Sequence, residues 1–490
     1  MRPTLVPLTT GRQDTVMSVA AGPGMGITVA AVGDGRRLPV GLPENHEVTV
    51  AQFDPAALDR REPALAAFQA SPEGQVPVTH PEEAEAVRRI RAYRIAVDGK
   101  RYKIIRGDIH RHTEISMDGA LDGSLWDLYR YSLNAAAFDY IAVTDHNYGA
   151  WLDTDEPEGR NTDDIYQYWR TQKSADIFHV PGRFTPLYGY ERSINFPLGH
   201  RNIVHVRRGV FSYRVPRLHI SERPELIEKD AQGLWAYLRR TDGVGIPHTS
   251  ATSMGTDWRL RDDEVEPVTE IYQGDRNAYE DEGQPRAALQ DATGPGEAGR
   301  QPFQKGLVWN ALGVGYKMGF IASSDHYSTH ISYANLLVPE GVTTRDDVQE
   351  SLRARRTYAS TDNIIVDFRA GNVLQGGELT AASSPVFTLR AVGTAPILRY
   401  EIIKNNTVVY SAAPGADATL TYRDDAFRES GMKETSQIRD WAKPEIGIRP
   451  RSKQPAAYYY VRVIQSYSAA EPNAEGEIAW SSPIFVHHGN

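Results

Sequence analysis

Two histidines two positions apart form the clearest chemical signal in the chain. His110 and His112 follow the apolar run at residues 102–105, which predicts a β-strand ending near them. Because side chains alternate along a strand, imidazoles at i and i+2 leave the same face. Polar groups gathered at a core-facing strand end are costly to bury unless they bind something, and a metal ion is the usual partner. The spacing therefore predicts a metal site.

Seven further residues with metal-binding side chains lie at or near the ends of other predicted strands. In chain order they are Asp118, His146, Glu191, His200, His248, Asp325 and His326. Each alone has an ordinary explanation, because a single histidine is commonly hydrogen-bonded in a core and an aspartate before glycine commonly forms a turn. Glu191 could pair with Arg192 or Arg201. Together, within one α/β pattern, they indicate a centre that binds metal through histidine and carboxylate.

A repeating strand–loop–helix pattern between residues 101 and 370 must position these side chains. Strands are predicted over residues 103–110, 138–145, 185–191, 202–206, 243–247, 268–272 and 318–322, and helices over 125–137, 163–177, 224–240, 305–314 and 345–356. This alternation indicates an α/β fold with a mostly parallel sheet, open or rolled into a barrel. In such folds ligands collect at the carboxyl ends of the strands.

The flanking regions have a different character. Residues 1–100 form a small accessory region, with short strands predicted over 18–32 and a helix between 63 and 89. Residues 371–490 contain short strands, at 386–390, 398–403, 408–410, 458–464 and 483–486, separated by Gly, Pro and Asn turns. That pattern is typical of a β-sandwich.

Composition excludes several classes of protein. The chain has 490 residues, a formal charge of −9 and no cysteine. Thiolate zinc, iron–sulfur and cysteine-nucleophile chemistry are excluded. The negative charge argues against nucleic acid as a partner, and no apolar run approaches the roughly 20 residues of a membrane helix. The N-terminus lacks the apolar core of a signal peptide, which leaves a cytoplasmic location open beside a periplasmic or secreted one after signal removal.

Three motifs in order carry a resemblance to a known family. GDIHRHTEIS (107–116), GYERS (189–193) and IASSDH (321–326) resemble the PHP (polymerase and histidinol phosphatase) superfamily of metallohydrolases, most closely its uncharacterised DUF3604 branch. The resemblance covers about residues 106–362. It implies a distorted (β/α)7 barrel with two or three divalent metal ions at the carboxyl ends of the strands.

Carried over residue by residue, the resemblance implies three neighbouring metal sites. The first would use His110, His112, Glu191 and Asp325; the second Glu191, His200 and His248; and the third Asp118, His146 and His326. Many family members place the final histidine two residues after the aspartate, where this chain has Tyr327. Adjacent strand residues face opposite ways, so Asp325 and His326 can both bind metal only if the strand has ended by Ser324. His330 is the alternative to His326, and His205 the alternative to His200.

A multi-metal centre predicts hydrolysis by an activated water, with the cations neutralising charge on the substrate oxygens. The candidate catalytic residues are Asp118, Glu191, Asp325, Arg201 and Arg276. Asp108 and Asp145 are expected to orient imidazoles. Arg111, Arg192, Arg201 and Arg276 could clamp a phosphate or carboxylate, or simply balance charge. Zn, Mn and Fe all suit such ligands.

Three functions are compatible with this site. The first is a phosphoesterase acting on a small anionic phosphate mono- or diester. The second is a carbamate, amide or carboxyl-ester hydrolase on the same metals, because both transition states need a metal hydroxide and a cationic oxyanion site. The third is a non-enzymatic binding protein with a relict site. The C-terminal region could contact carbohydrate or a surface partner through tyrosines such as those at 458–460, although packing explains them as well. The oligomeric state stays open.

Overall fold

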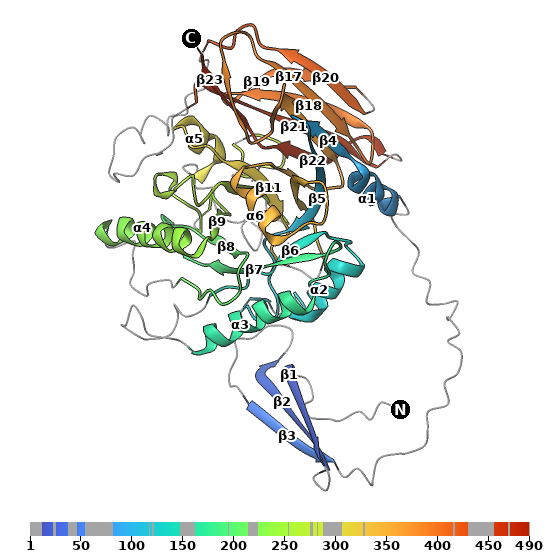
Figure 1. Cartoon of the computed structure of the whole chain (residues 1–490), viewed down its shortest axis with the longest axis vertical. Helices are drawn as coiled ribbons and strands as arrows, with labels where there is room; N and C mark the ends of the chain where they lie inside the picture. The colour runs from blue at the N-terminus through green and yellow to red at the C-terminus, as the bar shows by residue number, and fades with distance from the viewer. Residues whose placement is uncertain are drawn as a thin grey trace.

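The computed structural model contains four β-sheets and six α-helices in the described residues (Figure 1). The structure describes residues 12–22, 26–37, 47–53, 82–116, 118–119, 122–147, 162–194, 196–213, 224–252, 254–274, 278–281, 283–287, 306–326, 329–414, 417–429, 455–468 and 471–489. The fold is α/β with mixed sheets, and its C-terminal region is rich in strands. No helix in these ranges is both long enough and apolar enough to cross a membrane.

The largest sheet has 14 strands and holds most of the candidate residues at or near its strand ends. In chain order its strands are β4 (Arg94–Val97), β5 (Lys100–Asp108), β6 (Tyr140–Ala142), β7 (Thr185–Arg192), β8 (Arg201–His205), β9 (Val244–Pro247), β12 (Tyr333–Pro339), β13 (Thr357–Ser360), β16 (Glu378–Ala381), β18 (Ile397–Lys404), β19 (Thr407–Ala412), β21 (Ala457–Ser468), β22 (Glu471–Ser481) and β23 (Ile484–His488). In space they follow the order β16-β23-β21-β22-β13-β12-β5-β6-β7-β8-β9, with β4 beside β5 and the β18–β19 pair beside β21.

Strand directions in this sheet are mixed, whereas the sequence predicts a mostly parallel sheet. β5, β6 and β7 are parallel, but β8 is antiparallel to β7 and β9, and β12 is antiparallel to β5. Connection length explains the reversal between β7 and β8. Residues 193–200 join β7 to β8, too few for the crossover of a dozen or more residues that parallel neighbours need. The described strands therefore do not form a regular parallel (β/α)7 ring.

A separate parallel pair completes the α/β part. β10 (Val268–Gln273) and β11 (Gly319–Ser323) are hydrogen-bonded only to each other among the described strands. β10 lies alongside β9, and β11 lies alongside β12 and β13. Two bridges, Arg111 to Asp325 and His146 to Glu191, extend the parallel alignment beyond the ends of the strands. The residues that follow β5, β6, β7 and β11 are thereby brought to one region.

Two of the six described helices, α2 and α6, begin at a capping side chain. The six helices are α1 (Glu83–Ala92), α2 (Leu125–Asn134), α3 (Thr162–Ile177), α4 (Pro224–Thr241), α5 (Val308–Gly313) and α6 (Arg345–Arg353). The Ser124 hydroxyl caps α2 by accepting from the Asp127 N–H, and α2 buries Leu125, Leu128 and Tyr129 on one face. Thr344 and Asp347 form a reciprocal capping box at α6.

The C-terminal β region consists of two packed layers. Strands β14 (Ile365–Ala370), β15 (Val373–Leu374), β17 (Val386–Val392) and β20 (Ala418–Arg423) form a four-stranded sheet in the order β15-β14-β17-β20. Its inward face packs Phe387 against Tyr459 of β21, with ring centroids 4.4 Å apart. Figure 1 shows these strands at one end of the molecule. Because β13 pairs with β22, the large sheet continues from this region into the α/β part.

The N-terminal 100 residues contribute two features. β1 (Arg12–Gly22), β2 (Gly26–Arg37) and β3 (Glu47–Phe53) form an antiparallel sheet. α1 lies at the end of the predicted 63–89 helical stretch, and residues 54–81 are outside the described residues. β4 pairs with β5, so the end of this region is part of the main sheet.

Candidate metal centre

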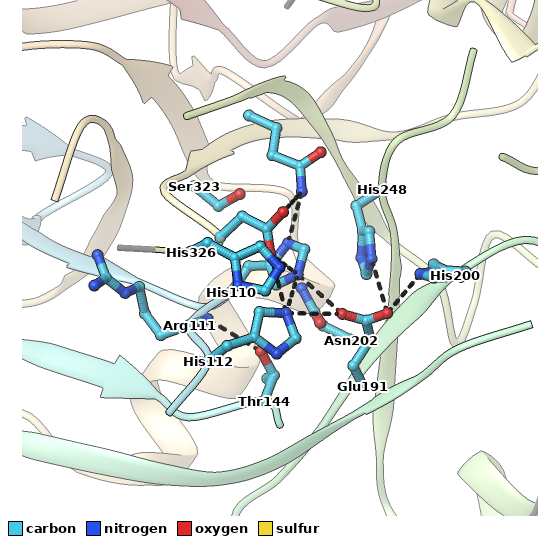
Figure 2. Close-up of polar contacts among 12 residues, drawn as sticks. His110, Arg111, His112, Thr144, Glu191, His200, Asn202, His248, Ser323 and His326 are labelled. Carbon is cyan, nitrogen blue, oxygen red and sulfur yellow. Dashed lines mark hydrogen bonds and ion pairs between the residues drawn. The ribbon is translucent and has the colours of Figure 1, made fainter. Parts of the chain in front are cut away.

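Four side-chain atoms face one another at the centre of the α/β part (Figure 2). The Nε2 atoms of His110 and His112 are 3.2 Å apart. Glu191 Oε2 lies 3.1 Å from each of them. Asp325 Oδ1 lies 3.1 Å from His110 Nε2 and 3.0 Å from His112 Nε2. All four side chains are buried, and they are the residues that the resemblance implies for the first metal.

Local backbone geometry aims these four side chains at one point. β5 ends at Asp108, so His110 and His112 follow the strand rather than lying within it. β11 ends at Ser323, and Asp325 adopts a φ of 63°. That left-handed conformation costs a non-glycine residue about 1–2 kcal/mol. Two main-chain hydrogen bonds hold it in place, from Asp325 N–H to His110 C=O and from His112 N–H to Asp325 C=O.

The second oxygen of Glu191 faces a different set of histidines. Oε1 lies 3.1 Å from His146 Nδ1, 2.6 Å from His200 Nδ1 and 3.6 Å from His248 Nε2. The dashed lines from Glu191 to His200 and His248 are visible in Figure 2. The Ser193 hydroxyl donates to the same oxygen at 3.0 Å. One carboxylate thus contacts two histidine groups through its two oxygens, which is the arrangement of a bridging ligand.

The third group lies nearer the surface. His146 Nε2 is 3.0 Å from Asp118 Oδ2, and His326 Nε2 is 3.6 Å from the same oxygen. His112 and His326 are stacked with ring centroids 4.4 Å apart. His326 also lies 3.6 Å from Asp325, because β11 has already ended before these two residues. An adjacent Asp–His pair can therefore face one centre without the spacing common in the family. Tyr327 is outside the described residues.

These groups fit a metal ion. Tetrahedral ligand atoms 2.0–2.1 Å from zinc are about 3.3–3.4 Å apart, close to the 3.0–3.2 Å separations around His110 and His112. Both ring nitrogens of the buried His248 lack a hydrogen-bond partner, a costly state that a bound ion would relieve. The buried His, Asp and Glu groups could therefore hold a metal ion.

The electrostatics of the cluster also favour a cation. Burial would raise the pKa of Glu191, but His146, His200 and His248 outweigh it and hold this pKa well below 4.5. Burial would lower the pKa of His112 and His146, yet the facing carboxylates raise these pKa values to about 9 and about 10. Without metal, protons on His112 and His146 balance the facing carboxylates, whereas burial lowers the pKa of His248 to about 3. Metal binding would displace those protons.

A hydrogen-bonded layer supports the ligands. The Ser116 hydroxyl lies 2.8 Å from His112 Nδ1 and 2.9 Å from Asp145 Oδ1, so Asp145 reaches the imidazole through Ser116. Asp108 instead accepts from the main-chain N–H groups of His110 and Ser324, which fixes the two loops to each other. Both residues were expected to orient imidazoles. Asp145 orients His112 indirectly through Ser116, whereas Asp108 fixes the two loops.

Sequence reasoning missed Glu270. This residue lies within β10, is fully buried, and places both carboxylate oxygens 3.1–3.2 Å from His110 Nδ1. Gln273 was missed as well; its side-chain amide donates to Asp325 Oδ2 at 2.8 Å. The signal that could have revealed Glu270 is a carboxylate between Val268 and Ile271 in a predicted strand, since a carboxylate buried there needs a partner.

The arginines expected to clamp substrate are held elsewhere. Arg201 is buried and contacts Glu266 and the carbonyls of Leu198, Gly199 and Leu260, none of them in the cluster. Arg192 binds both oxygens of Asp230 at 2.8 Å. Arg111 donates to the Thr329 carbonyl at 2.7 Å. Arg276 lies outside the described residues.

The two alternative histidines do not join the cluster. His330 is held between the hydroxyls of Tyr131 and Tyr333, each 2.6 Å from a ring nitrogen. His205 packs beside Tyr237 and Thr241. Burial lowers the pKa of His330 to about 3 and that of His205 to about 4. Both are neutral packing residues, and the structure brings His326 and His200 to the centre instead.

Comparison with known proteins adds one family match. Residues 129–298 match the family described as "Protein of unknown function (DUF3604)", a segment shorter than half of the chain that includes Glu191 and Glu270 but neither His110 nor Asp325. The match supports the expected resemblance to the DUF3604 branch. The wider PHP relationship remains a prediction. No curated protein matches the chain.

One solved structure with a measurable similarity is endonuclease Q in complex with a 27-mer duplex that carries an abasic lesion at the active site. It is 11% identical to this chain, and the similarity covers 51% of this chain and 56% of that chain, with a TM-score of 0.25. The chain thus covers little more than half the length of that protein. A TM-score this low carries no argument about fold or function.

Proposed function

We propose that the chain is a metal-dependent hydrolase that uses a metal-activated water, with phosphate mono- or diesters as its substrates. The observation that carries the proposal is the close approach of two imidazole nitrogens and two carboxylate oxygens, 3.0–3.2 Å apart, in a buried site. Two or three divalent ions bound here would supply the activated water and neutralise charge on the substrate oxygens.

The residues of the chain would divide the remaining work. Glu191 would hold two ligand groups side by side through its two oxygens. Asp325, in its left-handed conformation, would fix the first site to the loop that carries His110 and His112. Asp118 is the most exposed of the candidate ligands, so the third group would lie at the entrance used by substrate.

A carbamate, amide or carboxyl-ester hydrolase is the second candidate. The observation in its favour is that Arg111, Arg192 and Arg201 are engaged away from the cluster. A phosphate dianion commonly uses a guanidinium clamp, whereas an uncharged ester needs only an oxyanion site. In a phosphoesterase of this kind, the ions themselves would have to meet the charge of the phosphate.

The test combines metal content with a substrate panel. The purified chain is loaded with Mn²⁺, Zn²⁺ or Fe²⁺, its metal content is measured, and aryl phosphates, bis-aryl phosphates and aryl carbamates are offered. Phosphate hydrolysis that is lost on chelation and in Glu191→Gln, but kept in the surface variant Glu340→Gln, supports the proposal. Hydrolysis of carbamates alone selects the second candidate, and failure to bind any metal rejects both.

We also propose that the α/β part corresponds to the distorted barrel of the PHP superfamily. Strands β9 and β12 are the two ends of the run β9-β8-β7-β6-β5-β12. The β10–β11 pair lies between these two ends, beside both of them, and this supports the proposal. Packing rather than continuous hydrogen bonding would complete the ring. An experimental structure in which this pair leaves either neighbour would contradict the proposal.

A further inference from the structure

We propose that Glu270 is a positioning residue that fixes which ring nitrogen of His110 faces the candidate metal centre. This inference rests on the proposed metal-dependent function and adds a residue outside the implied ligand sets. Glu270 comes from β10, whereas His110 follows β5. The two strands share no hydrogen bonds in the described sheets.

The geometry around His110 defines two sides of one ring. Nε2 faces Glu191 and Asp325 at 3.1 Å each. Nδ1 faces the Glu270 carboxylate, with Oε1 at 3.1 Å and Oε2 at 3.2 Å. A buried carboxylate accepts and cannot donate, so Nδ1 carries the proton and donates to Glu270. In the neutral ring, the lone pair then lies on Nε2, directed at the proposed ion.

One neighbouring group competes for the same nitrogen. The Gln273 side-chain nitrogen lies 3.4 Å from His110 Nδ1, but it donates to Asp325 Oδ2 at 2.8 Å. The shorter contact is the stronger hydrogen bond, and two N–H donors cannot serve each other. Glu270 itself is held by the Asn202 side-chain amide, which donates to Oε1 at 3.1 Å. Asn202 and His110 appear together in Figure 2.

Direct metal binding by Glu270 is the competing explanation. Glu270 could form a group with His110 and His248, whose rings have centroids 4.0 Å apart. For His110 to serve that ion as well as the first, its ring would have to lose both protons and bind through both nitrogens. Neutral imidazole, with one donor and one acceptor nitrogen, needs no such ionisation. The donor role toward Glu270 is therefore favoured.

The test compares Glu270 with a second buried glutamate from the same neighbourhood. Glu270→Leu removes the acceptor, Glu270→Gln keeps an amide oxygen that can accept from Nδ1–H, and Glu266→Gln alters a buried carboxylate that pairs with Arg201. Zinc affinity is measured by chelator competition. We expect a loss of about 10–100-fold for Glu270→Leu, a smaller loss for Glu270→Gln, and an unchanged affinity for Glu266→Gln.

A spectroscopic measurement separates orientation from general stability. In the Co²⁺-loaded chain, the exchangeable N–H proton of a metal-bound imidazole gives a strongly shifted proton resonance that disappears in D₂O. The resonance of His110 is expected in the wild type and in Glu270→Gln, and its loss is expected in Glu270→Leu. If Glu270→Leu does not fold, the zinc affinity of Glu270→Gln decides, because an affinity equal to that of the wild type overturns the positioning role.

The outcomes also distinguish this inference from the proposed function. A wild-type chain that binds no metal overturns both. If Glu270→Leu binds zinc as tightly as the wild type does, the positioning role alone is overturned. Loss of one whole ion from Glu270→Leu, with unchanged affinity for the rest, identifies Glu270 as a direct ligand and also overturns it. If Glu266→Gln loses as much zinc affinity as Glu270→Leu, the effect is general destabilisation, and the positioning role is overturned as well.

Discussion

Replacing Arg201 with methionine is expected to destabilise the fold by about 3–5 kcal/mol without removing metal ligands. The Arg201 side chain is 1% exposed, and its partner Glu266 is fully buried. The guanidinium also donates at 2.9 Å to the carbonyls of Gly199 and Leu260. Among the described residues, its removal leaves the Glu266 carboxylate with hydrogen bonds from the Trp235 indole N–H at 3.3 Å and the Asp262 N–H at 3.1 Å.

The size of the effect follows from the uncompensated charge. Breaking a buried ion pair by removing one partner costs about 3–5 kcal/mol, whereas removing both partners costs much less. The double variant Arg201→Met/Glu266→Gln is therefore expected to recover part of the loss, with a coupling energy of about 1–3 kcal/mol. Arg130 provides a control, because it pairs with Asp127 at 3.1 Å and both side chains are exposed. Arg130→Met is expected to cost under about 1 kcal/mol.

Urea unfolding followed by circular dichroism, with chelator present, measures these differences. Metal stoichiometry of the native variants is measured separately. If Arg201 instead clamped substrate, Arg201→Met would keep the stability of the wild type and lose substrate affinity. If Arg201→Met unfolds within about 1 kcal/mol of the wild type, as Arg130→Met is expected to do, the structural role of Arg201 is refuted.

Three further predictions concern the bridge, a buried histidine and a close backbone approach. Glu191→Gln is expected to lose at least one bound ion by elemental analysis, because an amide offers one oxygen where the carboxylate offers two; an unchanged stoichiometry contradicts the bridge. His205 has a pKa lowered to about 4 by burial, from 6.5. Below pH 6.5 the unfolded chain takes up a proton that the folded chain excludes, so the free energy of unfolding falls by about 1.4 kcal/mol per pH unit down to about pH 4. His205→Asn, compared with the wild type in chelator, is expected to lack this slope. Gly306→Ala is expected to lose about 1–3 kcal/mol in thermal unfolding, because its Cβ would lie 1.6 Å from the Ser250 carbonyl oxygen; an unchanged midpoint shows that the two loops can separate freely.

Local patterns were enough to predict the strands that carry the candidate ligands. Alternating or continuous apolar runs located β5, β7, β9 and β11 within a few residues, and polar side chains at their ends indicated the centre. Strand ends can be predicted in this way because side-chain periodicity is a local property. The histidines that gather around Glu191 were all named from the sequence.

Long-range pairing could not be predicted in the same way. The antiparallel pairs β12–β5 and β8–β9 join strands that are far apart in the sequence, so their directions carry no local signal. Arg201 was expected at the site, but it pairs with Glu266. That pairing spans 65 positions in the sequence and leaves no local signal. Glu270 resembled an ordinary strand residue for the same reason, since its contact with His110 spans 160 positions.

The continuity of the large sheet has a consequence for how the chain can be divided. A fragment that ended at residue 370 would strip β22 from β13 and leave a row of open main-chain hydrogen-bonding groups. Such an exposed edge invites pairing with other molecules and aggregation. The same cut would remove Arg462 and Tyr460 from the fully buried Glu280. Proteolysis or gene truncation at that point is therefore expected to yield insoluble material rather than a smaller folded protein.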